Sequence, residues 1–459
     1  MYSQIGEEED AGLPVVADTT KRSTAKKLGA IAGIIAALIV VIAGVAITVG
    51  AIAGAQKLKT QYAYGLMIDA GSTGTRAHLY RWPAHSPGGI PIIDTKPSSM
   101  LKFKVKPGLS TIKISDIPKY IGNLTSWALE NVPAQKVPET PVFLKATAGM
   151  RTLPEAEQEE RLKEVREALR ESRFMFKDDS WATVIGGEEE GVFGWISTNY
   201  ATGTLFDPAG KSHAGALDMG GSSTQITFNP KDGAPKEGAY NVSMPGLEYT
   251  LYTHSFLGFG VNDFVESLED DAISKAPKTA EVVNFPCYLT GYEKKKTPTE
   301  YEDKKKNVTI KGVLNVNECK DLIREALKIN GSCAVAPCSI NGTYQPALDK
   351  DSTFYATGSY DYMGAFFGLS SVSKSSPKDL ETKVLEYCAL SWEEAESKYP
   401  SENEESRSLY CFEGLYDSVL LTEGYGFDAG EKRIVFADSV CGAPLGWTLG
   451  AMIYEASHL

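Results

Sequence analysis

Residues 66–82 read LMIDAGSTGTRAHLYRW, and the rest of the chain can be interpreted from this segment. Its apolar start predicts a buried strand that ends at Asp69, and the run Ala77–Trp82 predicts a second strand, so the two form a hairpin. The turn contains two glycines and three hydroxyl side chains, and the successive N–H groups of such a turn can bind an anion. Because Asp69 would repel a phosphate, its position predicts a divalent cation between the two. An ordinary glycine-rich hairpin is the alternative for this segment alone.

A second segment repeats this order of residues. LDMGGSSTQITF, residues 217–228, has an apolar start, then Asp218, two glycines, three hydroxyl side chains and a strand-like end. The two aspartates are 149 residues apart (218 − 69), which indicates an internal duplication. We therefore expect two lobes, each of which contributes one phosphate-binding turn to a central cleft.

The composition indicates a globular protein without a general nucleic-acid surface. Of the 459 residues, 42% are hydrophobic and 23% are charged, and the formal net charge is −13. A nucleic-acid surface needs clustered lysine and arginine side chains. Two basic runs, Lys294–Lys296 and Lys304–Lys306, have acidic residues between them, so we interpret them as parts of a solvated loop.

Residues 28–55 contain no charged side chain and are numerous enough for a helix that spans a bilayer. The segment KRSTAKK before them carries four basic residues, whereas only Lys57 and Lys59 follow closely. This bias predicts a single-pass type II membrane protein, with residues 1–27 as a cytoplasmic tail and 28–55 as a signal-anchor. Ala53–Ala55 resembles a signal-peptidase site, but the apolar stretch is long for a cleaved signal, so we favour an uncleaved anchor.

The cysteines and the glycosylation sequons agree with a catalytic domain outside the cytoplasm. All seven cysteines lie at or after residue 287, and proximity suggests three pairs: Cys287–Cys319, Cys333–Cys338 and Cys388–Cys411. Six cysteines can pair in many other ways, and Cys441 is left over. No cysteine or histidine spacing is typical of a zinc site. Five sequons follow the apolar segment, at Asn123, Asn241, Asn307, Asn330 and Asn341.

Five segments together resemble the apyrase family, which comprises the nucleoside triphosphate diphosphohydrolases and the Golgi guanosine-diphosphatases. They are IDAGSTGTR at 68–76, KATAGMR at 145–151, IGGEEEGVFGWISTNY at 185–200, LDMGGSSTQITF at 217–228 and GWTLGAM at 446–452. Each motif is weak alone, but their order is specific, and the resemblance extends over residues 64–456.

This resemblance implies an α/β fold of the actin-like superfamily, with two ribonuclease-H-like lobes and a nucleotide cleft between them, preceded by one transmembrane helix. Lobe I would comprise residues 60–186, and lobe II would comprise residues 187–433. Residues 434–459 would return to lobe I, with the strand-like run Ile434–Ala437 and the helix after it as the closing unit.

The resemblance implies that Glu190 is the general base that activates water, and that Ser223 and Gln225 position this water. From the residues alone, Glu188, Glu189 and Glu190 are equal candidates, because crowded carboxyls raise one another's pKa. The implied reaction is direct in-line attack of water on the terminal phosphorus, without a phosphoenzyme. A covalent route would need a base within reach of a serine or threonine hydroxyl, and Glu190 is the only base proposed.

The resemblance also implies a hydrated Mg²⁺ or Ca²⁺ ion and a phosphate chain held by both hairpins. Asp69 and Asp218 would hold the cation, with Thr147 near it. Trp447 would lie in the surroundings of the metal, through water, and a core tryptophan is the close alternative. The phosphate-binding residues would be Ser72, Thr73, Gly74 and Thr75 at one end, and Gly220, Gly221 and Ser222 at the other.

Recognition of the nucleobase is less defined by the sequence. The segment FYATGSYDY, residues 354–362, lies where the family places a stacking aromatic, so Tyr360 and Tyr362 are candidates, with Arg407 on the opposite side of the base. A core position is an equal alternative for these aromatics. Arg76 and Arg151 are either structural or phosphate-facing, and we favour the structural role for Arg76.

The implied function is metal-dependent hydrolysis of the terminal phosphate of nucleoside di- or triphosphates. The single anchor favours a lumenal GDPase or UDPase of the Golgi or secretory pathway over a surface enzyme that acts on extracellular ATP and ADP. A kinase or chaperone ATPase of the wider superfamily is opposed by the anchor and the sequons. A non-catalytic nucleotide-binding membrane protein is opposed by the intact Glu190, Ser223 and Gln225. The sequence does not predict the oligomeric state.

Overall fold

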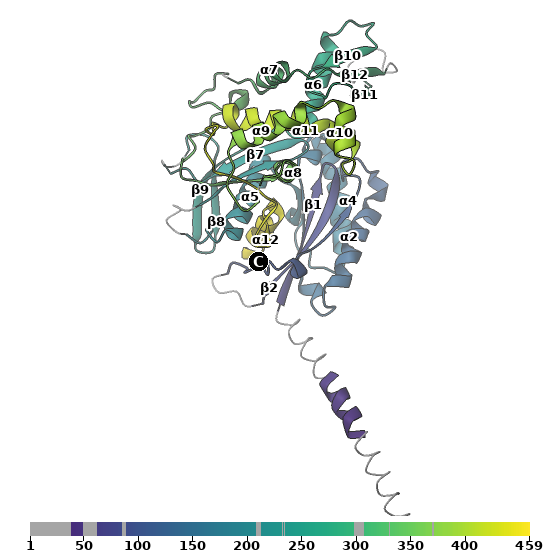
Figure 1. Cartoon of the computed structure of the whole chain (residues 1–459). Helices are drawn as coiled ribbons and strands as arrows, with labels where there is room; N and C mark the ends of the chain where they lie inside the picture. Colours follow the sequence, from purple (N-terminus) through teal and green to yellow (C-terminus); the bar gives the residue numbers. More distant parts are fainter. Residues whose placement is uncertain are drawn as a thin grey trace, which may run out of the picture. The chain divides into compact units, whose positions relative to one another are not determined.

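The computed structural model describes residues 38–48, 62–84, 89–207, 213–231, 233, 235–297, 307–329, 331–369 and 371–459 (Figure 1). The expected tail, most of the expected anchor and the sequon residue Asn330 lie outside these ranges. Residues 38–48 form a helix with exposed apolar side chains. Among the described helices, none combines the length and the apolar character that crossing a bilayer requires. Residues 1–61 and 62–459 form two separate units, and every described sheet belongs to the second unit.

The first sheet has five strands in the order β3-β2-β1-β4-β5. Their bounds are β1 Tyr62–Gly71, β2 Gly74–Pro83, β3 Leu101–Val105, β4 Val142–Ala146 and β5 Ala182–Val184. β1 is antiparallel to β2 and parallel to β4, which is parallel to β5, so the expected first hairpin is confirmed. The carboxyl ends of β1, β4 and β5 therefore share one edge, where ligands of α/β sheets bind. Helices α2 (Ile117–Asn131) and α4 (Glu155–Glu171) share a buried apolar core with this sheet.

The second sheet has six strands in the order β14-β13-β6-β7-β9-β8. Their bounds are β6 Gly215–Met219, β7 Ser223–Phe228, β8 Ala239–Met244, β9 Leu247–Leu257, β13 Phe354–Gly358 and β14 Ile434–Phe436. β6 and β7 form the expected second hairpin, and β13 and β14 lie parallel to β6 on its other side. Both sheets thus place an antiparallel hairpin beside two parallel strands, as a duplication predicts.

The C-terminal segment departs from the sequence-based expectation. The run at Ile434–Ala437 was expected to close the first lobe, but β14 pairs with β13 in the second sheet. The reason is its apolar character, since all three residues of β14 are buried at the edge of that sheet. The helix that follows, α12 (Trp447–Ser457), packs instead against β1 and against α5 (Gly187–Ala201).

Helices α5 and α12 form the centre of the unit. α5 also packs against β6, β7 and β9, so the two helices join both sheets. Their axes approach so closely that a Cβ on Gly450 would overlap the backbone carbonyl of Phe193. The buried apolar side chains around them come from both sheets and include Met67 of β1 and Leu251 of β9, which share this core with Trp195 of α5 and Met452 of α12. A shared core of this kind fixes the ends of β1 and β6 relative to each other.

The remaining longer helices and a small three-stranded sheet share one apolar core with the second sheet. The helices are α6 Val261–Lys275, α7 Val316–Leu327, α8 Ser359–Phe366, α9 Pro377–Cys388, α10 Trp392–Lys398 and α11 Glu404–Val419. The small sheet has the order β10-β12-β11, with β10 Val282–Phe285, β11 Glu293–Lys296 and β12 Val308–Gly312. Shorter helices are Pro97–Ser99, Ile114–Asp116, Val137–Glu139, α3 Ala148–Arg151, Asp179–Trp181, Ile340–Gly342 and the π-helical Leu420–Gly424. A two-stranded pair, β15 Ser439–Val440 and β16 Ala443–Pro444, precedes α12.

The three disulfides expected from proximity are confirmed, and Cys441 is free and exposed. Each bridge joins cysteines that are close in the sequence, at separations of 32, 5 and 23 residues. The described sequon residues are all exposed: Asn123, Asn241, Asn307 and Asn341.

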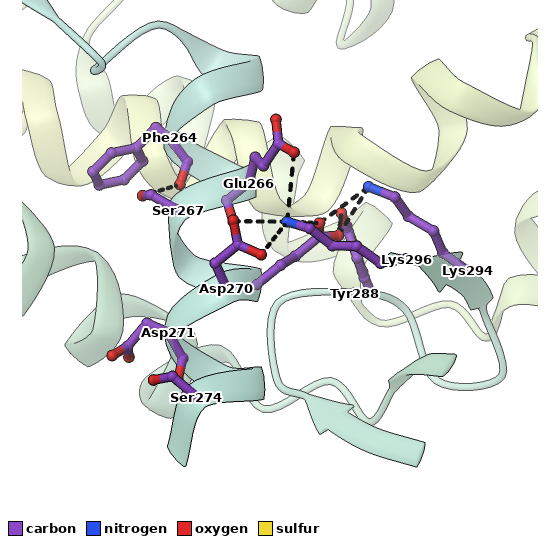
Figure 2. A network of polar contacts seen from close by, with 10 residues as sticks. Phe264, Glu266, Ser267, Asp270, Asp271, Ser274, Tyr288, Lys294 and Lys296 are labelled. Atoms are coloured by element: carbon purple, nitrogen blue, oxygen red, sulfur yellow. Dashed lines mark hydrogen bonds and ion pairs between the residues drawn. The ribbon is translucent and has the colours of Figure 1, made fainter. Parts of the chain in front are cut away.

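The basic run at 294–296 was expected in a solvated loop, and this expectation is wrong. It forms β11, and Lys294 and Lys296 of this strand form ion pairs with Glu269, a completely buried residue of α6. Figure 2 shows these two lysines and Tyr288. The Glu269 carboxylate accepts hydrogen bonds from the Tyr288 hydroxyl at 2.6 Å and from Lys294 Nζ at 3.0 Å, and Lys296 Nζ lies 3.2 Å away. A buried carboxylate needs such partners, so this network fastens β11 to α6. The other basic run, 304–306, lies outside the described residues.

Candidate active site

The aspartates of the two hairpins occupy equivalent positions, because each lies on the first strand and faces a residue of the second strand. In the first, Asp69 lies directly across from Arg76, and the turn is formed by the two residues between Gly71 and Gly74. In the second, Asp218 lies directly across from Gln225, and the turn is longer. The register therefore places a charged guanidinium beside one aspartate and a neutral amide beside the other.

The two turns approach each other. A Cβ on Gly221 would lie 3.4 Å from Ser72 Oγ, so the second turn comes within contact distance of the first. Backbone supports each turn from behind: a Cβ on Gly149 would lie only 2.6 Å from the Ser72 Cα, and one on Gly260 would overlap the Ser222 nitrogen. Ser72 and Gly221, one from each set of expected phosphate-binding residues, are thus brought within contact distance of each other.

The three acidic candidates for the base lie in the first turn of α5 and differ in their burial. Glu188 and Glu189 are partly exposed, whereas Glu190 is buried. Arg151, at the end of the turn after β4, donates from Nη2 to Glu190 Oε2 at 2.8 Å. Burial raises the pKa of Glu190 to about 8; the charge of Arg151 opposes this rise, and that of Asp218 adds to it. A carboxyl with a raised pKa is a stronger base than an exposed one, and the deprotonated form that accepts a proton from water becomes more populated as the pH rises through about 8.

A continuous set of hydrogen bonds leads from Glu190 to the second hairpin. The same Arg151 Nη2 donates to Ser223 Oγ at 3.2 Å. Gln225 Nε2 donates to Ser223 Oγ at 2.9 Å and to Ser255 Oγ at 2.8 Å. Ser255 was not predicted from the sequence, because only the pairing of β7 with β9 brings it opposite Gln225.

Asp69 is buried and Asp218 is partly buried, and the charge of Asp218 acts on Asp69. Arg76 Nη1 donates to Asp69 Oδ2 at 3.2 Å, and Thr357 Oγ1 donates to Asp218 Oδ1 at 3.2 Å. Burial raises the pKa of Asp69 to about 6; Arg76 opposes this rise, and the charge of Asp218 adds to it. Burial also raises the pKa of Asp218. Within the described part of the chain, no basic side chain forms an ion pair with Asp218.

The remaining candidates for the surroundings of a metal lie on neighbouring elements. Thr147 precedes α3, is buried, and donates from its backbone N–H to Ala70 O at 3.2 Å, which attaches it to the end of β1. Trp447 is the first residue of α12 and is 7% exposed.

The site fits a hydrated divalent cation better than a directly caged one. Among the described residues, no group of three histidine, cysteine, aspartate or glutamate side chains forms a metal cage. Asp69 and Asp218 nevertheless concentrate negative charge in a buried place, and Arg76 is the only cation paired with either of them in the described ranges. Mg²⁺ keeps several waters and takes one or two carboxylates plus substrate phosphates, so these two carboxylates suit it.

The two tyrosines expected near a nucleobase differ in their exposure to solvent. Tyr360 is completely buried in α8, so it presents no ring face for stacking, whereas Tyr362 is 72% exposed. Arg407 donates from Nη1 to the backbone carbonyls of Tyr399 at 3.2 Å and Glu402 at 2.6 Å. Its guanidinium is thus used in fastening α11 to the segment after α10, and of the two tyrosines Tyr362 is the one with a free face.

Two further buried acids lie on α11 and were not found from the sequence. Glu413 accepts a hydrogen bond from Ser359, the first residue of α8. Asp417 is completely buried, and within the described ranges its carboxylate oxygens have no hydrogen-bond partner. Burial raises the pKa of Glu413 to about 7 and raises the pKa of Asp417. Burial raises the pKa of Tyr425, and the charge of Asp417 adds to this rise; the Tyr425 hydroxyl lies 3.4 Å from Thr224 Oγ1 in the second hairpin.

Comparison with known proteins agrees with this geometry. Residues 55–459 match the GDA1/CD39 (nucleoside phosphatase) family. The chain is 32% identical over 407 residues to probable apyrase 3 of Arabidopsis thaliana, covering 85% of this chain and 82% of that protein. It is 32% identical over 422 residues to ectonucleoside triphosphate diphosphohydrolase 1 of Mus musculus, covering 85% of this chain and 80% of that protein. A crystal structure of nucleoside triphosphate hydrolases from Neospora caninum has a similar fold, with a TM-score of 0.65, 16% identity, and 90% and 96% of the two chains covered.

Proposed function

Because this chain belongs to the GDA1/CD39 (nucleoside phosphatase) family and hydrolyses nucleoside phosphates, we propose that the two hairpins and the start of α5 form its active site. The substrates are nucleoside di- and triphosphates, which lose their terminal phosphate. The observation that supports this most is the buried carboxyl of Glu190, with its raised pKa, joined through Arg151 to Ser223.

In the proposed mechanism, Glu190 removes a proton from the attacking water, and Ser223 and Gln225 hold this water in line with the terminal phosphorus. The glycine- and hydroxyl-rich turns of the two hairpins hold the phosphate oxygens. Asp69 and Asp218 would hold a hydrated Mg²⁺ or Ca²⁺ ion, with Thr147 and Trp447 around it, and a bound ion of this kind stabilises charge on the transferred phosphoryl group.

A covalent route through Ser223 has less support. The Ser223 hydroxyl receives hydrogen bonds from Arg151 and from the amide nitrogen of Gln225. Neither of these nitrogen groups can accept the proton that an attacking serine would have to release. Direct attack by water is therefore the mechanism we propose.

We also propose that the catalytic domain works in the secretory-pathway lumen or at the cell surface. Three disulfides favour an oxidising compartment, and four exposed sequon asparagines are accessible to glycosylation. The single predicted anchor favours a lumenal GDPase or UDPase over an ecto-enzyme that acts on extracellular ATP and ADP. For the nucleobase, we propose stacking on Tyr362, with Arg407 and Tyr360 supporting the surrounding structure.

The test is phosphate release by the purified full-length chain from ATP, ADP, GDP, UDP and AMP, each with Mg²⁺, Ca²⁺ or a chelator. We expect metal-dependent release from di- and triphosphates and none from AMP, and the ratio of diphosphate to triphosphate activity distinguishes the two compartments' roles. Release that is unaffected by chelator would contradict the metal site. Nucleotide binding without any release would replace the enzyme with a binding protein.

A matched pair of variants tests the base. Glu190→Gln should lower kcat by at least about a hundredfold while nucleotide still binds, because a general base contributes about 10²–10⁴ in rate. Glu189→Gln, the same change one residue earlier on the same helix, should stay within about threefold of wild type. Wild-type turnover in Glu190→Gln would exclude it as the base.

A further inference from the structure

Ser255 occupies a particular position between the second hairpin and the catalytic helix. It lies on β9 directly across from Gln225 of β7. Its hydroxyl is 2.8 Å from Gln225 Nε2. On the other side it fills the space that a Cβ on Gly187 would need, at the first turn of the helix that carries Glu190. Ser255 is thus in contact with both parts of the proposed water-binding site.

Counting hydrogens shows what Ser255 does to Gln225. The amide nitrogen carries two hydrogens, and both are used, one toward Ser223 Oγ at 2.9 Å and one toward Ser255 Oγ at 2.8 Å. The amide group is therefore held from both sides. Its carbonyl oxygen is left to accept a hydrogen from another group.

The same count defines the role of Ser223. A hydroxyl oxygen accepts two hydrogen bonds and donates one. The oxygen of Ser223 accepts from Arg151 Nη2 at 3.2 Å and from Gln225 Nε2 at 2.9 Å. Both acceptor positions are used, so its own hydrogen is the one still available to a ligand.

We propose that Ser255 is a positioning residue that fixes the Gln225 amide with its carbonyl oxygen toward the attacking water. This inference rests on the proposed function of Ser223 and Gln225. The carbonyl oxygen of Gln225 then accepts one hydrogen of the water and Glu190 takes the other, while the Ser223 hydroxyl donates toward the water or the phosphate. Ser255 itself touches neither the water nor the substrate.

Removal of the Ser255 hydroxyl leaves the amide nitrogen with one partner instead of two. The terminal torsion of a glutamine side chain is broad, so the amide then rotates, and the water is held less often in the attacking geometry. Such misplacement lowers the rate of the chemical step more than the binding of substrate. We expect Ser255→Ala to lower kcat about tenfold and to change KM by less than about twofold.

The experiment is a double-mutant cycle in the full-length chain with Ser255→Ala, Gln225→Ala and the double variant, measured by steady-state phosphate release with saturating Mg²⁺. If Ser255 acts through Gln225, its substitution lowers kcat about tenfold in the wild-type background and less than about twofold in the Gln225→Ala background.

Thr253→Val is the matched control. Thr253 lies on the same strand, is buried, bonds to Thr227 at 2.7 Å and to the Glu188 carbonyl of α5 at 3.3 Å, and faces Gly191 of the same helix. This variant loses these hydrogen bonds beside the same helix without removing a partner of Gln225. We expect a lower Tm with unchanged kcat, which separates a structural loss from a positioning loss.

Each other result has a definite meaning. An equal loss of kcat from Ser255→Ala in both backgrounds, or wild-type kcat in Ser255→Ala, overturns the positioning role while the proposed function stands. Wild-type kcat in Gln225→Ala overturns the role proposed for Gln225 itself, and the inference about Ser255 with it.

Discussion

The two hairpins have the same order of residues but different groups across from their aspartates. In β1–β2 the aspartate forms an ion pair with Arg76 across the strands, and in β6–β7 the aspartate faces Gln225, which takes part in the hydrogen bonds of the water-binding site. The two hairpins thus share a backbone arrangement, while one position in the register carries a different side chain. In the proposed site both hairpins hold phosphate, whereas only the second one takes part in positioning water.

The largest loss of activity is expected from substitution of either aspartate, and the two variants should differ in thermal stability. Asp69→Asn and Asp218→Asn should each lower kcat by at least about a hundredfold, because a metal ion supplies several kcal/mol to this kind of reaction. In chelator at pH 8, Asp218→Asn should raise the Tm more than Asp69→Asn, because the charge of Asp69 is already partly offset by Arg76. Calorimetry and phosphate release measure the two properties. Equal Tm changes would remove the electrostatic difference between the hairpins.

The backbone behind the turns should matter for both hairpins alike. Gly149→Ala forces a Cβ to within 2.6 Å of the Ser72 Cα, and Gly260→Ala forces one against the Ser222 nitrogen. Overpacking of this kind costs about 1–3 kcal/mol, so each change should displace its turn and lower kcat/KM about tenfold. Kinetics with ADP test this, with Gly122→Ala in α2, where an added Cβ meets nothing within 4 Å, as a control for expression. A loss from one substitution alone would show that a single turn holds the phosphate.

A smaller, pH-dependent effect is expected from Arg76→Gln, which makes the first hairpin resemble the second. The charge of Arg76 lowers the pKa of Asp69, which is about 6 in the wild type. Without Arg76 this pKa rises, so a larger fraction of Asp69 is protonated at pH 6 and cannot bind a cation. We expect the Mg²⁺ concentration for half-maximal activity to rise about threefold at pH 6 and to change little at pH 8. A pH-independent change would point instead to direct contact between Arg76 and phosphate.

The smallest effect is expected from the buried acids near the second hairpin. The pKa of Asp417 is raised, so the folded protein keeps a proton that the unfolded chain loses above the ordinary pKa of aspartate. The stability that the protein has with Asp417 protonated in both states is therefore fully present below the ordinary pKa of aspartate and falls as the pH rises above it. Asp417→Asn removes this loss and should raise the Tm by about 1–3 °C at pH 8, with no change at pH 4. A Tm difference that is independent of pH would contradict the raised pKa.

Local sequence predicted the elements whose residues are neighbours in the chain. Both hairpins were found because an apolar run, an acidic residue and a glycine-rich turn follow one another directly. The disulfides were found because their cysteines are close in sequence. In the same way, an acidic turn at 188–190 was recognised as a candidate for the base.

The features that local sequence did not predict depend on contacts between residues that are distant in the chain. Only the burial of Glu190 beside Arg151 separates it from its two acidic neighbours. Ser255 is 30 residues from Gln225 and meets it only through strand pairing. The lysines of β11 belong to a buried network because Glu269 lies on α6, and β14 joined the second sheet through a parallel pairing with a distant strand. Contacts of this kind have no local signal in the sequence.

The position of α12 has a consequence for how the protein is made. The helix covers β1, yet it begins 376 positions after the end of that strand (447 − 71). During synthesis both hairpins are therefore complete before α12 exists, and until then the apolar side chain of Met67 lacks the neighbours that α12 supplies. The centre of the enzyme can therefore be assembled only after α12 has been made. A chain stopped before Trp447 would leave the first hairpin without the helix that covers it.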